Sequence, residues 1–379
     1  MKKRHSAHHL FWLGLRVVLG LSATFCVLSF LRIQSEYKPE PPFTWTQLPF
    51  TGPPKIAFLF LVRANLPLDF LWNHFFLNGD SRNFSIYIHS KPGFVLDEST
   101  TRCTFCYGRQ LSQSIQVGWG EATMIKAERI LIQKALQDPA NQRFVLLSES
   151  CVPLYNFSYI YNYLLASPKS FVDSFLDTKE GRYNPKMSSV IPKDRWKKGS
   201  QWITLIRKHA ELVVTDDRIF PVFERYCKRR PPSDELEEKV SRSFLFSFHK
   251  PNVQKEHNCI PDEHYVQTLL AMRDLEDEVE RRTLTYTSWN QSTTETEKQA
   301  WHPLTFGYRN ADSHRIKEIK DINHVYYETE YRTEWCWRNG TAAPCFLFAR
   351  KFSRGAAIRL LNEGVVGEFD GALYLKPSL

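Results

Sequence analysis

An acidic pair stands at the start of an apolar segment in the second half of the chain. The stretch HNCIPDEHYVQTLL, residues 257–270, places Asp262 and Glu263 directly after Pro261. Proline fits the first turn of a helix, and early acidic residues complement the positive end of the helix dipole. A carboxylate held at a helix start can also remove a proton from a bound hydroxyl group, as a general base does. The local pattern therefore allows both a helix cap and a catalytic group.

A basic cluster lies near the C-terminus. The stretch YRTEWCWRNGTAAPCFLFARKF contains Arg332, Arg338, Arg350 and Lys351. Arginine and lysine can neutralise a diphosphate through their charge and hydrogen bonds, without a metal ion. The alternative interpretation is a basic surface loop that precedes the final helix.

Aromatic and basic residues also gather in residues 192–214, PKDRWKKGSQWITLIRKHAELVV. In one interpretation this segment is a solvated basic edge, with Trp196 and Trp202 in the core. In the other it is a carbohydrate-binding face, because flat rings stack on sugars while charged groups bind hydroxyls or carboxylates.

Several catalytic motifs are absent from the sequence. It contains no Gly-x-Gly-x-x-Gly, P-loop, Gly-x-Ser-x-Gly or His-Glu-x-x-His motif, which argues against dinucleotide oxidoreductases, NTPases, serine hydrolases and zincins. It also lacks an Asp-x-Asp motif, and the nearest acidic triplet ending in Asp is residues 368–370. No carboxylate pair of the kind that glycoside hydrolases use is recognisable. We therefore expect no metal site and no cofactor.

Strand and helix patterns alternate in the first part of the body. Continuous apolar runs predict strands at residues 55–62, 84–90 and 143–150, with a short strand at 114–118 and helices at 67–77 and 121–136. This alternation predicts an α/β fold with right-handed crossovers. Ligands of such sheets bind beyond the carboxyl ends of the strands, here near Arg63, Ser90 and residues 148–153.

The N-terminal region predicts a membrane anchor. Residues 10–31 are 22 mostly apolar residues with one charge, Arg16, which is long enough to cross a bilayer. More positive charge precedes this segment than follows it, so residues 1–9 are expected in the cytoplasm and the body in a lumen. A cleaved signal peptide is the alternative. Residues 32–54 are proline-rich and predict an extended stem, followed by one domain at 55–379.

The overall charge does not indicate nucleic-acid binding. Of the net charge of +9, +4 falls in the first 36 residues, and no basic run interleaved with aromatic residues appears. With 42% apolar residues the chain can bury one large core or two modest ones. No nucleic-acid partner is expected.

The cysteines and glycosylation sequons fit an oxidising compartment. Of eight cysteines, Cys26 lies in the predicted anchor, and the other seven allow three disulfides and one free thiol. Cys336 and Cys345 flank a short turn and are expected to pair, whereas the Cys103-x-x-Cys106 motif lacks the second pair of a zinc site. Four sequons are candidate glycosylation sites: Asn83, Asn156, Asn290 and Asn339.

An ordered set of motifs resembles a known family. The N-terminal anchor is followed by KIAFLFLV, GSQW (199–202), PDEHY (261–265), WHPLTF (301–306) and FARKF (348–352). Together they look like the core-2/I-branching N-acetylglucosaminyltransferases, and more narrowly their plant brittle-culm-type branch. The resemblance covers about residues 55–352. It implies a GT-A-like fold, a Rossmann-like mixed sheet flanked by helices. It also implies single-pass type II topology in the Golgi membrane and metal-independent, inverting transfer from a UDP-sugar to a glycan hydroxyl.

The resemblance also implies roles for particular residues. Glu263 matches the catalytic base, with Asp262 as a cap or orienting group, and Lys351 matches the lysine that binds the leaving diphosphate. Arg332 best matches a second diphosphate ligand, with Arg338 as its rival. The expected acceptor side of the site consists of Arg195, Trp202 and Trp289, and His302 and Pro303 belong to a pocket wall that serves packing or sugar contact.

One position departs from the family pattern. The animal enzymes carry an aspartate after the histidine of the second strand, whereas this chain has His89, Ser90 and Lys91. Uridine recognition is therefore the least supported of the implied contacts. N-acetylglucosamine is the expected donor sugar, glucuronic acid is the alternative, and the plant branch implies a cell-wall or glycoprotein glycan as acceptor. The competing interpretation is a membrane-anchored lumenal lectin or scaffold that keeps the fold without turnover.

Overall fold

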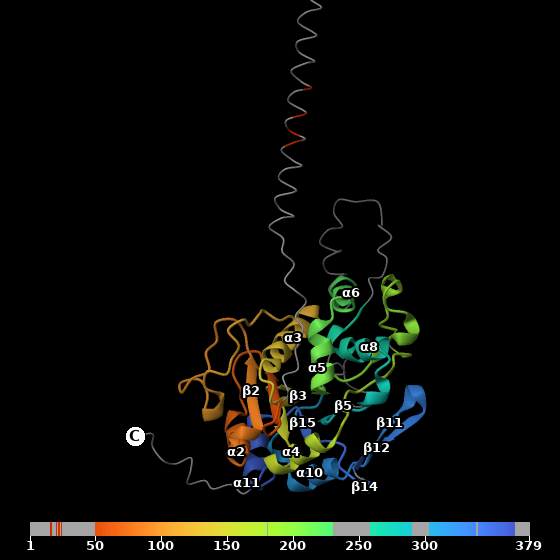
Figure 1. Cartoon of the computed structure of the whole chain (residues 1–379). Coiled ribbons are helices and arrows are strands. Elements are labelled where there is room, and N and C mark those ends of the chain that lie inside the picture. Colours follow the sequence, from red (N-terminus) through yellow and green to blue (C-terminus); the bar gives the residue numbers. More distant parts are fainter. Residues whose placement is uncertain are drawn as a thin grey trace, which may run out of the picture. The chain divides into compact units, whose positions relative to one another are not determined.

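The chain divides into two units, residues 1–46 and 47–379. The computed structural model describes residues 50–179, 181–229, 258–289, 303–338 and 340–367, together with positions 16, 20, 22 and 24 (Figure 1). Within the first unit those four positions have helical backbone, and Thr24 Oγ1 donates to the Gly20 carbonyl at 2.9 Å.

The predicted anchor and stem fall almost entirely outside the described residues. Of residues 10–31 only the four helical positions are described, and of residues 32–54 only 50–54. Among the residues that are described, no helix has the length and apolar character needed to cross a bilayer. The anchor, the stem and the membrane topology remain predictions.

Three parallel strands form the centre of the larger unit. Strand β1 (Lys55–Leu61) pairs in parallel with β2 (Phe84–His89) on one side and with β3 (Asn141–Ser148) on the other. Six of its seven residues are buried, because helices cover both faces of the sheet. The continuous apolar runs thus correctly predicted these three strands.

The rest of the main sheet is mixed. Its order is β2-β1-β3-β8-β5-β9, with β8 (Thr204–Ile206), β5 (Ser170–Phe171) and β9 (Val279–Glu280) completing the six strands. Strand β8 runs antiparallel to both β3 and β5, whereas β5 and β9 are parallel. The α/β class and the mixed sheet that the resemblance implied are confirmed, and the parallel part of the sheet consists of β1 to β3 and of the pair β5 and β9.

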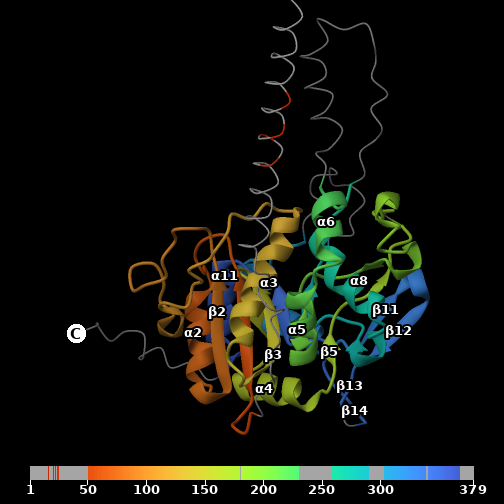
Figure 2. The same ribbon diagram turned by 45° about the horizontal axis from the view of Figure 1, so that its top comes forward.

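Helices cover the two faces of β1 to β3. On one face Ile56, Phe58 and Phe60 pack with α2 (Asp69–Leu77), α4 (Phe157–Ala166), α10 (Ser313–Lys320) and α11 (Arg354–Asn362). On the other, α3 (Ala122–Leu136) contacts the strands and α5 (Arg207–Thr215). Figure 2 shows α3 and α5 beside α8 (Tyr265–Met272), with α6 (Phe220–Tyr226) at the end of this layer.

A small second sheet brings the C-terminal segment to the main sheet. Strand β15 (Phe348–Arg350) pairs in parallel with β10 (Thr285–Thr287) and antiparallel with β4 (Val152–Pro153). The Phe352 N–H donates to the Ser150 carbonyl at 3.0 Å, which holds the segment after β15 beside the end of β3. The remaining strands form three pairs: β6 (Phe175–Leu176) with β7 (Lys197–Lys198), β11 (His324–Tyr327) with β12 (Arg332–Trp335), and β13 (Trp337–Arg338) with β14 (Thr341–Ala342).

The expected strand at residues 114–118 is wrong. The segment has no regular strand structure, and the Ile115 N–H donates to His89 Nε2 at 3.1 Å instead of to a strand carbonyl. Alternating apolar residues here line a cleft, described below, and do not extend the sheet.

The cysteine predictions are confirmed. The structure contains the disulfides Cys103–Cys106, Cys227–Cys259 and Cys336–Cys345, and Cys151 is a buried free thiol. Two of the four sequons are described: Asn83 ends a short 3-10 helix and is partly exposed, and Asn156 is exposed as the N-cap of α4. Asn290 and Asn339 lie outside the described residues.

Substitution of Trp72 tests the aromatic core. The Trp72 ring is fully buried against Phe60, Phe75 and Phe76, and its Nε1 donates to the Cys151 carbonyl at 3.1 Å. We expect Trp72→Ala to lower the free energy of unfolding by about 3–5 kcal/mol in denaturant titrations, since it opens a cavity and orphans that carbonyl. Leu77→Ala on the same helix is the control, because half of that side chain is exposed; equal losses would contradict the assignment of the core.

Candidate active site

A large cleft of about 1750 Å³ opens at the carboxyl ends of the parallel strands. One wall consists of Leu61 to Arg63 at the end of β1, His89 at the end of β2 and Ser148 to Ser150 at the end of β3. Residues 198–202, 262–263 and 350–354 form the others. The location is the one at which open α/β sheets bind their ligands.

Glu263 reaches this cleft from the 3-10 turn Pro261–Glu263, which leads directly into α8. Its Oε2 forms an ion pair with Nη1 of Arg182, a residue 81 positions earlier in the sequence. The Glu263 side chain is 27% exposed, whereas the preceding Asp262 is buried. The N-cap of α8 is His264, whose side chain makes no capping bond, so the contacts of Glu263 belong to the cleft and not to the helix end.

Backbone contacts fix the position of Glu263. The Gly199 N–H donates to the Glu263 carbonyl at 2.9 Å, and Gln267 Nε2 donates to the Ser200 carbonyl at 3.2 Å. A side chain at position 199 could not be accommodated, since an added Cβ would lie 1.9 Å from the Asp173 carbonyl oxygen. The GSQW motif therefore has a structural reason for its glycine.

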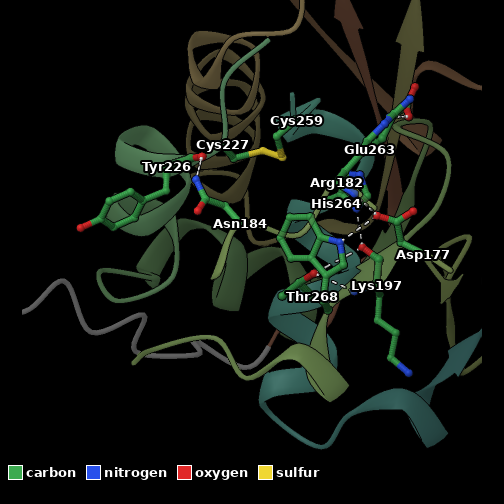
Figure 3. Close-up of a disulfide and its surroundings, with 11 residues drawn as sticks. Asp177, Arg182, Asn184, Lys197, Tyr226, Cys227, Cys259, Glu263, His264 and Thr268 are labelled. Atoms are coloured by element: carbon green, nitrogen blue, oxygen red, sulfur yellow. Dashed lines mark hydrogen bonds and ion pairs between the residues drawn. A yellow bond between two sulfur atoms is a disulfide. The ribbon is translucent and has the colours of Figure 1, made fainter. Parts of the chain in front are cut away.

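The rings of His264 and Trp196 and the partly buried carboxylate of Asp177 support the turn. His264 stacks on Trp196 with ring centroids 4.4 Å apart, and its Nδ1–H donates to the Lys197 carbonyl at 2.8 Å. Asp177 accepts from Trp196 Nε1 at 3.2 Å and from the Arg182 N–H at 2.9 Å. Figure 3 shows this group next to the Cys227–Cys259 disulfide. Burial lowers the pKa of His264 to about 3, so the imidazole is neutral and acts as a packing and hydrogen-bonding group.

Burial raises the pKa of two carboxyl groups near Glu263, those of Asp262 and Glu128. Burial, and secondarily the charge of Glu263, raises the pKa of Asp262 to about 7, while Arg182 and Arg350 oppose the shift. Asp262 Oδ1 has no hydrogen-bond partner. Burial also raises the pKa of Glu128 well above its ordinary value, although Gln201 Nε2 donates to it at 2.7 Å. Both shifts lower the negative charge beneath the cleft.

A group of cations also lines the cleft. Lys351, Arg350, Arg63 and Arg354 all line it, and Arg63 is paired with Glu149. Burial, followed by repulsion from Arg350 and Arg63, lowers the pKa of Lys351. The guanidinium of Arg350 lies 4.5 Å from the centre of the Trp202 ring, and its buried Nε has no partner. A bound anion would relieve the repulsion among these cations, so this group is suited to phosphate oxygens.

The three other predicted arginines do not line the cleft. Arg332 on β12 bonds to Glu330, Glu334 and the Ser174 carbonyl, and its guanidinium lies 4.1 Å from the ring centre of Tyr327, which does line the cleft. Arg338 donates to the Asn162 carbonyl at 3.0 Å. Arg195 donates to Asp274 and to the Ala271 carbonyl at 2.5 and 2.8 Å. Their predicted roles would require these side chains to leave such partners.

The predicted aromatic residues of the acceptor side are both at the cleft. Trp202 is buried in its wall under Arg350, and Trp289 is half exposed at its rim, with Pro303 also among the lining residues. His302 lies outside the described residues. His89 accepts from the Ile115 N–H, and burial lowers its pKa, so it lines the cleft as a neutral imidazole. The sequence did not point to Arg182 or Tyr327, because neither belongs to a motif or a periodic pattern.

No metal site is visible among the described residues: no group of three or more His, Cys, Asp or Glu side chains is placed to hold an ion. Metal independence stays a prediction.

Comparison with known proteins identifies the family. Residues 56–320 match the family described as "Core-2/I-Branching enzyme". The chain is also 50% identical over 339 residues to "Glycosyltransferase BC10" of Oryza sativa subsp. japonica, which covers 88% of this chain and 80% of that protein. The chain belongs to the core-2/I-branching enzyme family and is a glycosyltransferase.

Solved structures give only a distant likeness. The galactosyltransferase LgtC in complex with donor and acceptor sugar analogues is 9% identical, with a TM-score of 0.34, over 84% of this chain and 99% of that one. A structure of an active-site mutant of LgtC, also 9% identical, gives a TM-score of 0.32 over the same shares of the two chains. Similarity at this level adds nothing to the assignment of the fold.

The pKa of Asp262 predicts a pH dependence of stability. Between about pH 4 and pH 7 the Asp262 carboxyl keeps its proton in the folded chain, whereas the same group in the unfolded chain has lost it. The free energy of unfolding therefore falls as the pH rises through this window. We expect Asp262→Asn to remove up to about 4 kcal/mol of this fall, measured by urea unfolding at several pH values. Exposed Asp217→Asn is the control, and parallel curves for wild type and Asp262→Asn would refute the assignment.

The close approach at Gly199 predicts a sharp steric effect. We expect Gly199→Ala to lower the free energy of unfolding by about 1–3 kcal/mol or more and to displace Glu263, since the new Cβ meets the Asp173 carbonyl. In Gly355→Ala the nearest contact is 3.5 Å, so this control should keep or slightly raise stability. Thermal melts and transfer assays of both variants provide the measurement; an unaffected Gly199→Ala protein would contradict the geometry.

Proposed function

We propose that the chain transfers a sugar from a UDP-sugar to a glycan hydroxyl, with inversion and without a metal ion. One observation carries the proposal. Glu263 and the cation group of Lys351, Arg350 and Arg63 line the same cleft at the carboxyl ends of β1 to β3. A carboxylate is the base that a hydroxyl acceptor needs, and the cations match a diphosphate leaving group.

The reaction proposed for this cleft is a single displacement. The acceptor oxygen attacks the anomeric carbon while its proton passes to the Glu263 carboxylate. The bond from the anomeric carbon to the diphosphate oxygen breaks, and UDP leaves with that electron pair. Attack from the face opposite UDP inverts the anomeric centre, and no covalent intermediate on the enzyme is needed.

Arg182 orients the base in this proposal. Its contact is with Oε2 of Glu263, which leaves Oε1 to face the acceptor hydroxyl. The Arg182 N–H donates to Asp177, which also accepts from Trp196, so the arginine is itself positioned by the support beneath Glu263. Holding a carboxylate in one rotamer is how a positioned base gains over a mobile one.

The diphosphate contacts are assigned to cleft residues. Lys351 and Arg350, which both line the cleft, are proposed to bind it. Arg332 and Arg338 remain candidate ligands from the resemblance, and Arg332 is separated from the cleft by the Tyr327 ring. Trp202 and Trp289 are proposed to contact the acceptor, together with Arg195 if it leaves Asp274.

The finer features are proposals supported by family membership. They include a GT-A-like fold and anchoring in the Golgi membrane through residues 10–31 with a lumenal catalytic domain. N-acetylglucosamine is the proposed donor sugar, glucuronic acid is the alternative, and a plant wall or glycoprotein glycan is the proposed acceptor. Glycosylation is proposed at the sequons, of which Asn156 is exposed.

Substitutions of Glu263 and Lys351 test this function. With the full chain, UDP release from a panel of UDP-sugars in EDTA should single out one donor. Glu263→Gln should lower kcat by at least about a hundredfold, because the base is lost, while UDP affinity is unchanged. Lys351→Ala should weaken UDP binding about tenfold and lower turnover as well.

Exposed Glu98→Gln and Lys186→Ala are the matched controls and should behave as wild type. Transfer retained by Glu263→Gln would remove that residue as the base. A folded wild-type protein that binds no nucleotide sugar would favour the lectin or scaffold.

A further inference from the structure

A two-stranded ribbon forms part of the cleft wall and has a second, outward face. The ribbon consists of β11, the 3-10 turn Glu328–Glu330, Tyr331 and β12. Val325 and Tyr327 point inward and line the cleft. Because side chains alternate along a strand, the outer face carries the other set: His324, Tyr326, Thr333 and Trp335.

The outer face exposes large aromatic rings. Tyr326 is 56% exposed, Trp335 is 52% exposed, and Tyr331 at the turn is 87% exposed. Trp335 is the cross-strand partner of His324, with ring centroids 4.9 Å apart, and Tyr326 lies on the adjacent diagonal. Trp337, just beyond β12, adds another exposed ring. These rings contribute little to the core, so their presence here calls for a ligand.

The backbone at Tyr331 supports this interpretation. Its φ is +50°, a left-handed conformation that glycine or asparagine adopts more easily than tyrosine. The Tyr331 side chain is almost fully exposed, so packing does not compensate for the strain. A strained, exposed aromatic residue at a turn is typical of a recognition site.

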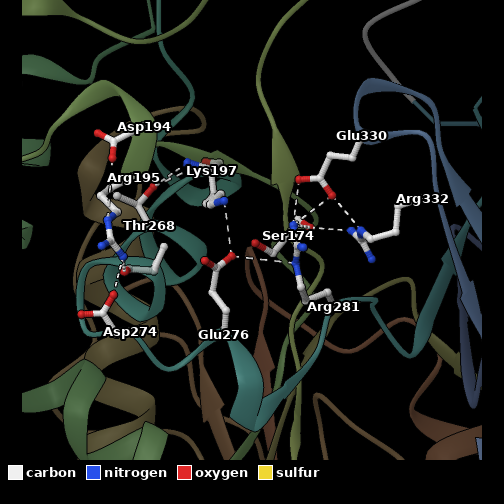
Figure 4. A network of polar contacts seen from close by, with 11 residues as sticks. Ser174, Asp194, Arg195, Lys197, Thr268, Asp274, Glu276, Arg281, Glu330 and Arg332 are labelled. Atoms are coloured by element: carbon white, nitrogen blue, oxygen red, sulfur yellow. Dashed lines mark hydrogen bonds and ion pairs between the residues drawn. The ribbon is translucent and has the colours of Figure 1, made fainter.

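The ribbon is held rigid by a polar network that Figure 4 shows. Arg281 Nη2 donates to Glu330 and to the Ser174 carbonyl, and Arg332 Nη2 donates to the same carbonyl at 2.9 Å. The Cys336–Cys345 disulfide follows β12 directly. A ligand that meets this face therefore finds the rings already ordered, which lowers the entropic cost of binding.

We propose that the outer face of the ribbon binds the acceptor glycan chain at sugars beyond the one that reacts. This rests on the proposed function, because the occupant is the chain that leaves the cleft along the ribbon wall. The outer face combines flat rings with hydroxyl and imidazole groups and has no aliphatic side chain. That composition suits a neutral oligosaccharide or polysaccharide, whose C–H faces stack on rings and whose hydroxyls bind polar tips, better than an apolar protein surface.

Affinity electrophoresis tests the surface directly. Full-length Glu263→Gln protein, which should not turn over, is run in gels containing arabinogalactan, xyloglucan or arabinoxylan. We expect retardation by at least one polysaccharide. Adding Tyr326→Ala, Tyr331→Gly and Trp335→Ala should weaken it about tenfold. The glycine suits the left-handed turn, and unchanged thermal melts report folding.

Tyr308→Ala is the matched control, since that tyrosine is equally exposed but lies outside the ribbon. Equal retardation of the triple variant, or no retardation of the parent by any polysaccharide, would overturn the proposal. Binding of a protein from the same compartment in place of glycans, lost in the triple variant, would also overturn it.

A second assay separates this inference from the proposed function. In protein that keeps the wild-type Glu263, the three ribbon substitutions should leave transfer to a monosaccharide glycoside unchanged. The KM for a long acceptor should rise about tenfold. If wild type releases UDP from no donor but ribbon-dependent retardation persists, the proposed function fails and the glycan surface stands. If transfer occurs but the ribbon variants leave KM for the long acceptor unchanged, only the surface is refuted.

Discussion

The hydrogen bond from the Gly199 N–H to the Glu263 carbonyl is the contact on which the cleft depends. It joins the segment before β8 to the turn that carries the carboxylate, and it requires the Asp173 backbone to approach position 199 more closely than any side chain allows. Asp173 in turn accepts from the Ser200 N–H and from the Tyr327 hydroxyl. One close backbone contact thus aligns three cleft walls that come from distant parts of the chain, and a displacement of any of them would move Glu263 relative to the cations.

The charge distribution follows from the same packing. Asp262 and Glu128 lie in surroundings that favour their neutral forms, so they add little negative charge near the cleft for which we propose diphosphate binding. Burial lowers the pKa of both Arg350 and Lys351, and repulsion from Arg350 and Arg63 lowers the pKa of Lys351 further, so a bound anion would stabilise both charged forms. The proposed base and the proposed anion site can therefore share one cleft, because burial favours the neutral forms of the two carboxyl groups that would repel an anionic ligand.

The sequence predicted the elements that have local signals. Continuous apolar runs gave β1, β2 and β3, and the short spacing of Cys336 and Cys345 gave their disulfide. The strand predicted at residues 114–118 was wrong, because the apolar side chains of Ile115 and Val117 line the cleft and do not pack in a sheet. Two features have no local sequence signal: the antiparallel direction of β8 and the ion pair of Arg182 with a carboxylate 81 residues away. Both depend on contacts between distant segments, so only the folded structure shows them.

The aromatic residues, 14% of the chain, serve two physical ends. One set, centred on Phe58 and Trp72, fills the core between β1 and α2, where area removed from water stabilises the fold. The β11–β12 ribbon uses its rings differently: Tyr327 faces the cleft, while Tyr326 and Trp335 face solvent on the other side. Successive side chains of a strand point to opposite faces, so a shift of the β11–β12 pairing by one residue would move the inner side chains outward and the outer rings inward. A ribbon of this kind couples the shape of the cleft to the surface on its other side, so the proposed glycan surface and the proposed active site would depend on the same strand register.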